Sequence, residues 1–216
     1  MTGHRKRLID KINEIPLEYL DKVDILELIL FLTNSRKNTR DIARNLLQRF
    51  HRIGAIAQSD DLMEIDGVGE FSCAFMKCIF KICEYILMEK VIDAPINMRN
   101  LIEYFQFMTK DKAHEVFYLV VLNVHNQVFS IEVVEEGSAS HVSINIPKLI
   151  RMILNHNASG VILCHNHPGG SVHPSYSDIE ITKNIKSILS KLHIKLVDSL
   201  IITNTSFFSF DESKLL

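Results

Sequence analysis

The sequence has little cysteine, and no segment marks it for export. Its four cysteines form no Cys-x-x-Cys pair, so they give no sign of a disulfide framework or a redox motif. The first residues, MTGHRKRLIDKINE, lack the apolar run of a signal peptide. Both absences favour the reducing cytoplasm as the compartment of this protein.

Long apolar runs and a surplus of one charge are also missing. No apolar stretch reaches the roughly 18 residues that a bilayer-spanning helix needs, so the sequence predicts no membrane segment. The formal net charge of −2 predicts no overall basic field that would attract nucleic acid or a membrane surface. The 216 residues have 47% hydrophobic content, which is enough to bury a sizeable core in one large domain or two small ones.

Residues 1–93 predict a small helical domain. Apolar residues recur at helical spacing in Arg5–Ile15 and again after Asn38. The segment Val23–Leu32 is apolar enough for a helix that is buried on most of its surface, and Asp24 is the expected cap at its start. We therefore expect short helices joined by turns in this part of the chain.

A Gly-Val-Gly turn within this half precedes a long predicted helix at Phe71–Met88. Gly67 and Gly69 allow a tight turn, which leaves bare backbone amides at the start of the next helix, where they can hold a phosphate oxygen. The arrangement resembles a helix-hairpin-helix, which binds the DNA backbone independently of sequence. The resemblance implies DNA contact through residues 62–78, centred on Gly67, Val68 and Gly69.

The charges around this turn argue against DNA contact. Asp66 and Glu70 flank the turn, and residues 1–93 contain 14 Lys and Arg against 15 Asp and Glu. This half therefore has no excess of positive charge with which to bind DNA phosphates. A structural or protein-docking role for the helical half therefore remains open. Cys73, Cys78 and Cys83 are spaced too far apart to share one helix face as ligands, so we expect them to pack in the core.

Residues 94–216 predict a second, α/β domain after a linker near Pro95. A helix from Asn97 leads to an apolar strand at 116–124 and, after a hairpin turn, to a returning strand at 128–135. Strands and helices then alternate to the end of the chain: a helix at 147–156, a strand at 161–167, a helix from 175 or 176 to 192, and strands at 195–203 and 207–210. This order predicts a mixed sheet covered by helices on both faces.

The most informative stretch of the chain is Gly160–Asp178, GVILCHNHPGGSVHPSYSD. Its apolar start predicts a buried strand, and the alternation of side chains along a strand lets His165 and His167 aim their imidazoles at one point. If the loop after them folds back, Asp178 can bring a carboxylate to the same point. Two imidazoles and one carboxylate leave a fourth tetrahedral position open, as in a catalytic zinc site.

The same residues also have a purely structural explanation. Ser175 and Asp178 have the spacing of a helix-capping pair at the start of the next helix. Histidines near a loop are often simply solvated. The capping and metal-binding explanations of Ser175 do not exclude each other, because one residue can serve both.

Together these residues form a recognisable signature. His-x-His, seven residues, then Ser-x-x-Asp, here His165, His167, Ser175 and Asp178, matches the JAMM motif of the JAB/MPN metalloproteases. The wording CHNHPGG and PSYSD resembles the RadC branch of that superfamily. The resemblance implies a deaminase-like α-β-α domain at 94–216, preceded by a helix-hairpin-helix domain at 1–93.

The resemblance also implies an activity. We expect a zinc-dependent metallopeptidase or isopeptidase-like hydrolase that binds one Zn²⁺ per chain and cleaves an amide of a peptide or protein substrate. The alternative is a DNA-associated repair or recombination accessory protein without peptidase activity, which binds DNA through the helical domain.

The expected catalytic base is a glutamate on an upstream strand. RadC-like sequences commonly show Glu-x-Leu-Phe-x-Gly-Thr there, and counting back five residues from Gly137 selects Glu132. Glu135 remains the alternative base. Acidic residues replace the usual Phe and its neighbour here, so the alignment of the motif with this strand is ambiguous. In the implied mechanism Glu132 takes a proton from water, and Ser175 donates a hydrogen bond to the oxyanion of the tetrahedral intermediate.

Overall fold

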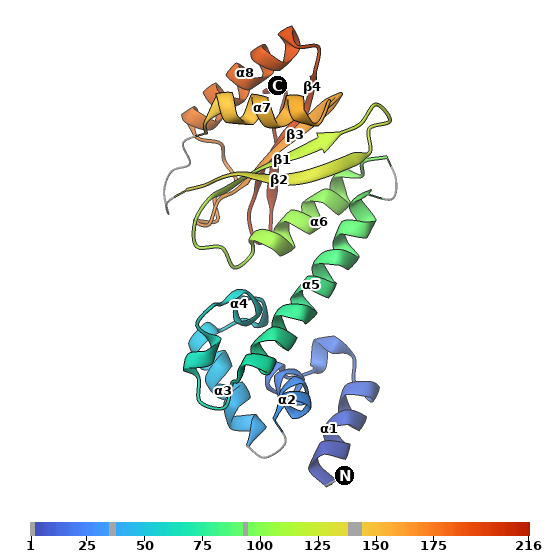
Figure 1. Ribbon diagram of the computed structural model, residues 1–216, viewed down its shortest axis with the longest axis vertical. Helices are drawn as coiled ribbons and strands as arrows, with labels where there is room; N and C mark the ends of the chain where they lie inside the picture. Colours follow the sequence, from blue (N-terminus) through green and yellow to red (C-terminus); the bar gives the residue numbers. More distant parts are fainter. Residues whose placement is uncertain (1–2, 35–37, 93–94, 138–143) are drawn as a thin grey trace. The chain divides into compact units, whose positions relative to one another are not determined.

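The computed structural model describes residues 3–34, 38–92, 95–137 and 144–216 (Figure 1). It divides into two compact units, Met1–Cys83 and Glu84–Leu216. This boundary lies within helix α5 (Glu70–Ile92), ten residues before the expected division after residue 93. Among the described residues, no helix is both long enough and apolar enough to span a membrane.

The N-terminal unit is built from helices, as predicted, around a core that includes Leu26, Leu30, Leu46 and Ile56. Its elements before α5 are α1 (Gly3–Glu14), η1 (Leu17–Tyr19), α2 (Lys22–Thr33), α3 (Thr39–Phe50), α4 (Ile53–Gln58) and η2 (Leu62–Glu64). The cap of α2 is Asp21, whose side chain accepts a hydrogen bond from the Val23 amide. Asp24, the expected cap, instead lies inside the helix and is buried.

Asp24 belongs to a buried charge network that joins α1, α2 and α3. Asp24 and Glu27 are only 3% and 2% exposed, and one guanidinium nitrogen of Arg40 donates to both, at 3.0 and 2.9 Å. Lys11 also pairs with Asp24, and His4 pairs with Glu27. Burial raises the pKa of Asp24, but hydrogen bonds from Lys11 and Arg40 outweigh it, so the pKa lies below its usual value.

Removal of Arg40 should therefore destabilise the fold. We expect Arg40→Ala to lower the free energy of unfolding by about 2–3 kcal/mol, because two buried carboxylates lose a shared partner. Arg44→Ala on the same helix is the matched control: its partner Asp41 is 59% exposed, so the expected change is below about 0.5 kcal/mol. Urea unfolding of the full chain, followed by circular dichroism, measures both.

Low pH should reduce the difference in the free energy of unfolding between Arg40→Ala and the wild type. A carboxyl whose pKa is depressed by folding stabilises the native state above its unfolded pKa, and this contribution is lost as the pH falls through its folded pKa. The ordinary pKa of an aspartate, which applies to Asp24 in the unfolded chain, is 3.8. The difference in the free energy of unfolding should therefore have its full size near neutral pH and be smaller at about pH 3. An equal difference at both pH values would contradict this account of the network.

The cysteines of α5 do not all lie in the core. Cys73 is partly buried, but Cys78 and Cys83 are exposed, so the expectation of core packing was wrong for these two. The cause is geometric: residues five apart on a helix differ by about 140° in direction. A 23-residue helix that buries one side must therefore expose part of such a series.

The C-terminal unit contains a mixed five-stranded sheet in the order β2-β1-β3-β4-β5. The strands are β1 (Val116–Leu122), β2 (Val128–Glu136), β3 (Gly160–Asn166), β4 (Lys195–Ile202) and β5 (Phe207–Ser209). β3 and β4 are parallel, and the other neighbouring pairs are antiparallel. β3 lies in the middle of the sheet and is buried along its whole length, which explains its continuous apolar sequence.

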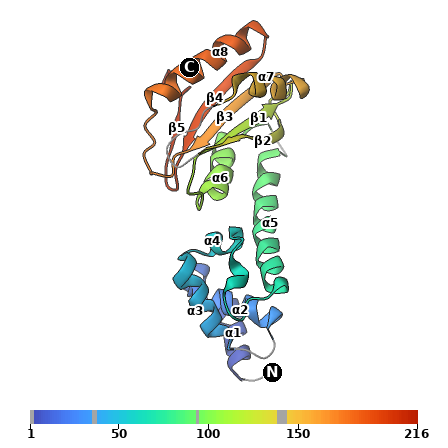
Figure 2. The same ribbon diagram turned by 60° about the vertical axis from the view of Figure 1, so that its left-hand side comes forward.

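Helices cover both faces of this sheet, as the sequence predicted (Figures 1 and 2). α6 (Met98–Thr109) packs on one face, with Phe105 against Tyr118. α7 (Ile146–Asn155) and α8 (Tyr176–Lys191) cover the other face. There Leu149 of α7 and Ile185 of α8 join Phe117 and Leu163 of the sheet in one core.

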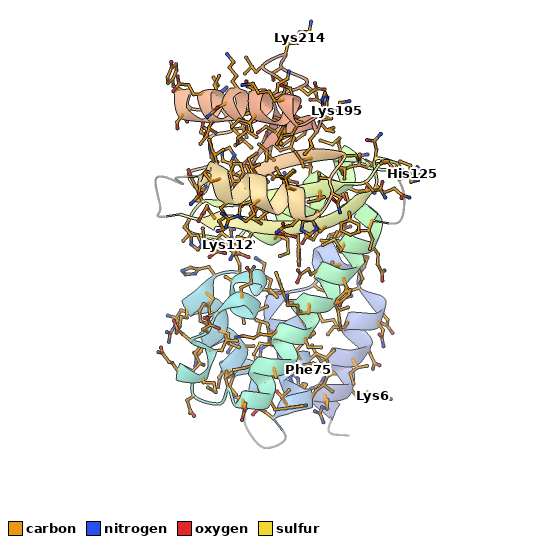
Figure 3. The ribbon with its side chains drawn as sticks, turned by 45° about the horizontal axis from the view of Figure 1, so that its top comes forward. Lys6, Phe75, Lys112, His125, Lys195 and Lys214 are labelled. Carbon is orange, nitrogen blue, oxygen red and sulfur yellow. The ribbon has the colours of Figure 1, made fainter. Side chains whose placement is uncertain are left out.

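The two ends of the sheet differ. Figure 3 labels His125 in the tight turn between β1 and β2, where Asn126 has a positive φ of 56°. The pairing of Leu122 with Gly160 places this turn near the start of β3. The opposite end, where β1 begins and β3 ends, carries the candidate site.

Candidate metal centre

The carboxyl end of β3 supplies two histidines to the site. His165 is the penultimate residue of β3 and pairs across the sheet with Phe117 of β1. The two rings stack, with centroids 5.8 Å apart and planes 16° apart. His167 lies two residues later and therefore points to the same side. The side chains of His165 and His167 are 7% and 16% exposed, so the last turn of chain at the end of β3 places both in a pocket that is largely closed to water.

A capping box at the start of α8 supplies the carboxylate. The Asp178 amide donates to Ser175 Oγ at 3.2 Å, and the Ser175 amide donates back to Asp178 Oδ2 at 2.7 Å. The Ser175 hydroxyl donates to the same Oδ2, at 2.6 Å. Capping fixes the carboxylate beside the histidines, so the structural and the metal-binding explanations of this pair coincide here.

The three side chains converge on one point. His165 Nε2 lies 3.0 Å from His167 Nε2 and 3.5 Å from Asp178 Oδ1, and His167 Nε2 lies 3.8 Å from Asp178 Oδ2. Ligands bound tetrahedrally to zinc at about 2.0–2.1 Å are about 3.3 Å apart. The donor set and its spacing therefore fit a zinc ion with one position left for water.

Both imidazoles are prepared to act as ligands. Burial lowers the pKa of His165 to about 4, while the Asp178 carboxylate raises it and His167 lowers it, each by less. The ring is therefore neutral at neutral pH. His167 Nδ1 lies 2.8 Å from the Ser171 carbonyl oxygen, and because a carbonyl oxygen only accepts, Nδ1 carries the proton. Its Nε2 is then the ring nitrogen that faces the other two candidate ligands.

The His165 ring has one unmatched atom. Its Nδ1 is buried and has no hydrogen-bond partner among the described residues. A buried polar atom without a partner is costly, so ligation through Nε2 and stacking on Phe117 are the interactions available to orient this ring.

A cavity of about 340 Å³ opens over the three side chains. Phe117, Ile144 and Ile181 form its apolar wall, and Ser175, Tyr176 and Ser177 line it at the start of α8. One further acid, Glu115, lines it as well. No cation of the described residues pairs with the Glu115 carboxylate. The cavity therefore combines the three candidate ligands with a further acidic residue that forms no ion pair within the described part of the chain.

Strand register explains how Glu115 reaches the site. Phe117 pairs with His165, so in an antiparallel ladder Glu115, two residues earlier, lies level with His167. The buried side chain of Asn166 secures this segment: its Oδ1 accepts from the Val116 amide at 2.8 Å, and its Nδ2 donates to the His114 carbonyl at 3.1 Å. Asn166 thus holds the backbone on both sides of Glu115.

Glu132, the base expected from the sequence, is not brought to the site. Its carboxylate pairs with His156, and its backbone pairs with Leu119 on the edge strand β2. The rival Glu135 pairs with Lys148 at 3.2 Å. Neither residue lines the cavity. The glutamate that lines the cavity is Glu115, because β1, which Glu115 precedes, is the neighbour of β3, whereas β2 is one strand further away.

Ser175 lies beside the candidate ligands. Its hydroxyl donates to Asp178 Oδ2, so in this arrangement it orients a candidate ligand, and its role toward an oxyanion stays a prediction.

The Gly-Val-Gly turn is a tight turn, as expected. Gly67 has a φ of 93°, a conformation that favours glycine, and the Val68 side chain packs in the core of the N-terminal unit. Two basic side chains near the turn are already paired, Arg49 with Glu64 and Lys77 with Asp60. The geometry therefore adds nothing to the expectation of DNA contact.

Comparison with known proteins agrees with this fold. The RadC-like JAB domain family matches residues 96–215. A UPF0758 protein of Fusobacterium nucleatum is 32% identical over 225 residues, which cover 99% of this chain and 97% of the relative. A UPF0758 protein of Thiobacillus denitrificans is 30% identical over 82% of this chain and 81% of the relative. A UPF0758 protein of Dechloromonas aromatica is also 30% identical, over 91% of this chain and 90% of the relative. The chain therefore belongs to the RadC family and carries its JAB domain.

Proposed function

We propose that this protein is a zinc-dependent hydrolase that cleaves an amide bond in a peptide or protein. The observation that carries the proposal is the convergence of two imidazole nitrogens and a carboxylate in a cavity that Glu115 also lines. His165, His167 and Asp178 would hold the ion. Zinc, when bound, supplies an acidified water, whose pKa falls from about 15.7 toward about 7, and polarises a carbonyl.

The residues of the chain supply the remaining steps. Glu115 accepts the proton of the attacking water and returns it to the leaving nitrogen, the usual task of a carboxylate general base. Ser175 holds the Asp178 carboxylate in place through its hydroxyl and amide. The wall formed by Phe117, Ile144 and Ile181 excludes water from one side and receives an apolar part of the substrate.

A cleavage screen tests the proposal. Full-length protein loaded with zinc is incubated with an unbiased peptide library, and the products are read by mass spectrometry. We expect cleavage at amide bonds that is lost after chelation and restored by added zinc. A fully loaded, folded protein that cleaves no member of the library or of a set of folded protein substrates would contradict the proposal.

No observation favours the alternative, a DNA-associated accessory protein without peptidase activity. Asp66 and Glu70 flank the Gly-Val-Gly turn, and the ion pairs of Arg49 and Lys77 reduce the positive charge available to phosphates. We therefore propose only the hydrolase.

A further inference from the structure

A second hollow adjoins the metal cavity along α8. It has a volume of about 370 Å³ and is lined by Ser177, Glu180, Ile181 and Asn184. Ser177 and Ile181 also line the metal cavity, so the two hollows share a wall. Along the helix axis, Glu180 and Asn184 lie about 3 and 9 Å beyond Asp178. One residue of an extended peptide spans about 3.3 Å, so the hollow lies one to three residues from the scissile bond.

Glu180 gives this hollow a fixed negative charge. The hydroxyl of Tyr176, one helical turn earlier, donates to Glu180 Oε1 at 3.0 Å. This bond holds the carboxylate and leaves its second oxygen available. Glu180 forms no ion pair with any described residue, and neither hollow is lined by Lys or Arg. The charge is therefore not neutralised by a neighbouring lining residue.

Tyr176 adds a second attraction for a cation. Its side chain is 77% exposed and lines the metal cavity beside the Glu180 hollow. An aromatic ring attracts a cation that lies over its face. A carboxylate beside an open aromatic ring is suited to the ammonium or guanidinium group of a long side chain, whose methylenes can lie along Ile181.

We propose that this hollow is a subsite for a Lys or Arg side chain of the substrate, within three residues of the bond that is cut. The inference rests on the proposed function and narrows it to amides flanked by a basic residue. Acidic residues at the same substrate position are disfavoured, because the carboxylate of Glu180 repels them.

The test combines cleavage with binding. Peptide libraries with Lys, Arg, Gln or Glu fixed in turn at each position are presented to zinc-loaded wild type for cleavage. They are also presented to zinc-loaded Glu115→Gln for binding, read by fluorescence anisotropy. We expect Lys or Arg to be favoured over Glu at one position by about tenfold. Glu180→Lys, introduced into both proteins, should reverse that preference. Glu212→Lys is the control, because Glu212 is exposed and lines neither hollow.

The outcomes separate the two proposals. Binding that prefers basic residues and depends on Glu180, without any cleavage by the wild type, supports the subsite and contradicts the hydrolase. Cleavage or binding without a preference for basic residues overturns the subsite alone. So does a preference that Glu180→Lys and Glu212→Lys change equally, because that result reports net charge. Absence of both binding and cleavage overturns both proposals.

Discussion

Replacement of Glu115 by glutamine is expected to lower the rate of amide hydrolysis by about 10²–10⁴-fold, because the amide has the shape of the carboxylate but cannot accept a proton at neutral pH. Zinc affinity should be unchanged, since Glu115 lines the cavity but is not one of the three converging side chains. Steady-state cleavage of a peptide found in the library screen, with the zinc content measured on the same samples, tests both statements.

Glu132→Gln is the matched control for this experiment. Glu132 lies on β2 and pairs with His156, outside the cavity, so its replacement should leave the rate close to that of the wild type. The reverse pattern, a large loss in Glu132→Gln and none in Glu115→Gln, would show that the register of β1 against β3 does not place the base.

Replacement of both His165 and His167 by alanine should weaken zinc binding by about 10³-fold or more, because only one of the three ligands remains. Competition with a chelating dye, using the full-length protein at neutral pH, measures the affinity. His156→Ala serves as the control, since His156 pairs with Glu132 and does not belong to the converging group. Equal zinc affinity in the double variant and the wild type, both folded by circular dichroism, would remove the metal site from this end of the sheet.

The sequence predicted the parts of the site that depend on local signals. His165 and His167 belong to one strand end, and Ser175 with Asp178 forms a capping box within one helical turn. Strand alternation and helix capping are properties of a few neighbouring residues, so the pattern of letters is enough to predict them.

Glu115 could not be placed in the same way. It lies 50 residues before His165 in the sequence, and only the pairing of β1 with β3 brings the two together. The spacing of the Glu-x-Leu-Phe-x-Gly-Thr motif points to the strand after the hairpin, which is the edge strand β2. A signal was nevertheless present: an acid stands immediately before the fully apolar run Val116–Leu122, at a strand end where a buried scaffold can hold a functional group.

The N-terminal helices show a second limit of local patterns. Asp24 resembles a helix cap because it stands near the start of an apolar segment, yet Asp21 takes that role. What permits Asp24 and Glu27 to be buried is Arg40, which arrives from the next helix. In the sequence, an acidic residue that is buried beside a distant cation cannot be distinguished from one that is exposed to solvent.

The most direct test of the account is anomalous X-ray diffraction at the zinc edge from crystals of the full chain grown with zinc. We expect one peak per chain, about 2.0–2.2 Å from Nε2 of His165, Nε2 of His167 and one Asp178 oxygen, with the Glu115 carboxylate facing the remaining position. A peak at another location, or an Asp178 carboxylate beyond bonding distance of the ion, would contradict it.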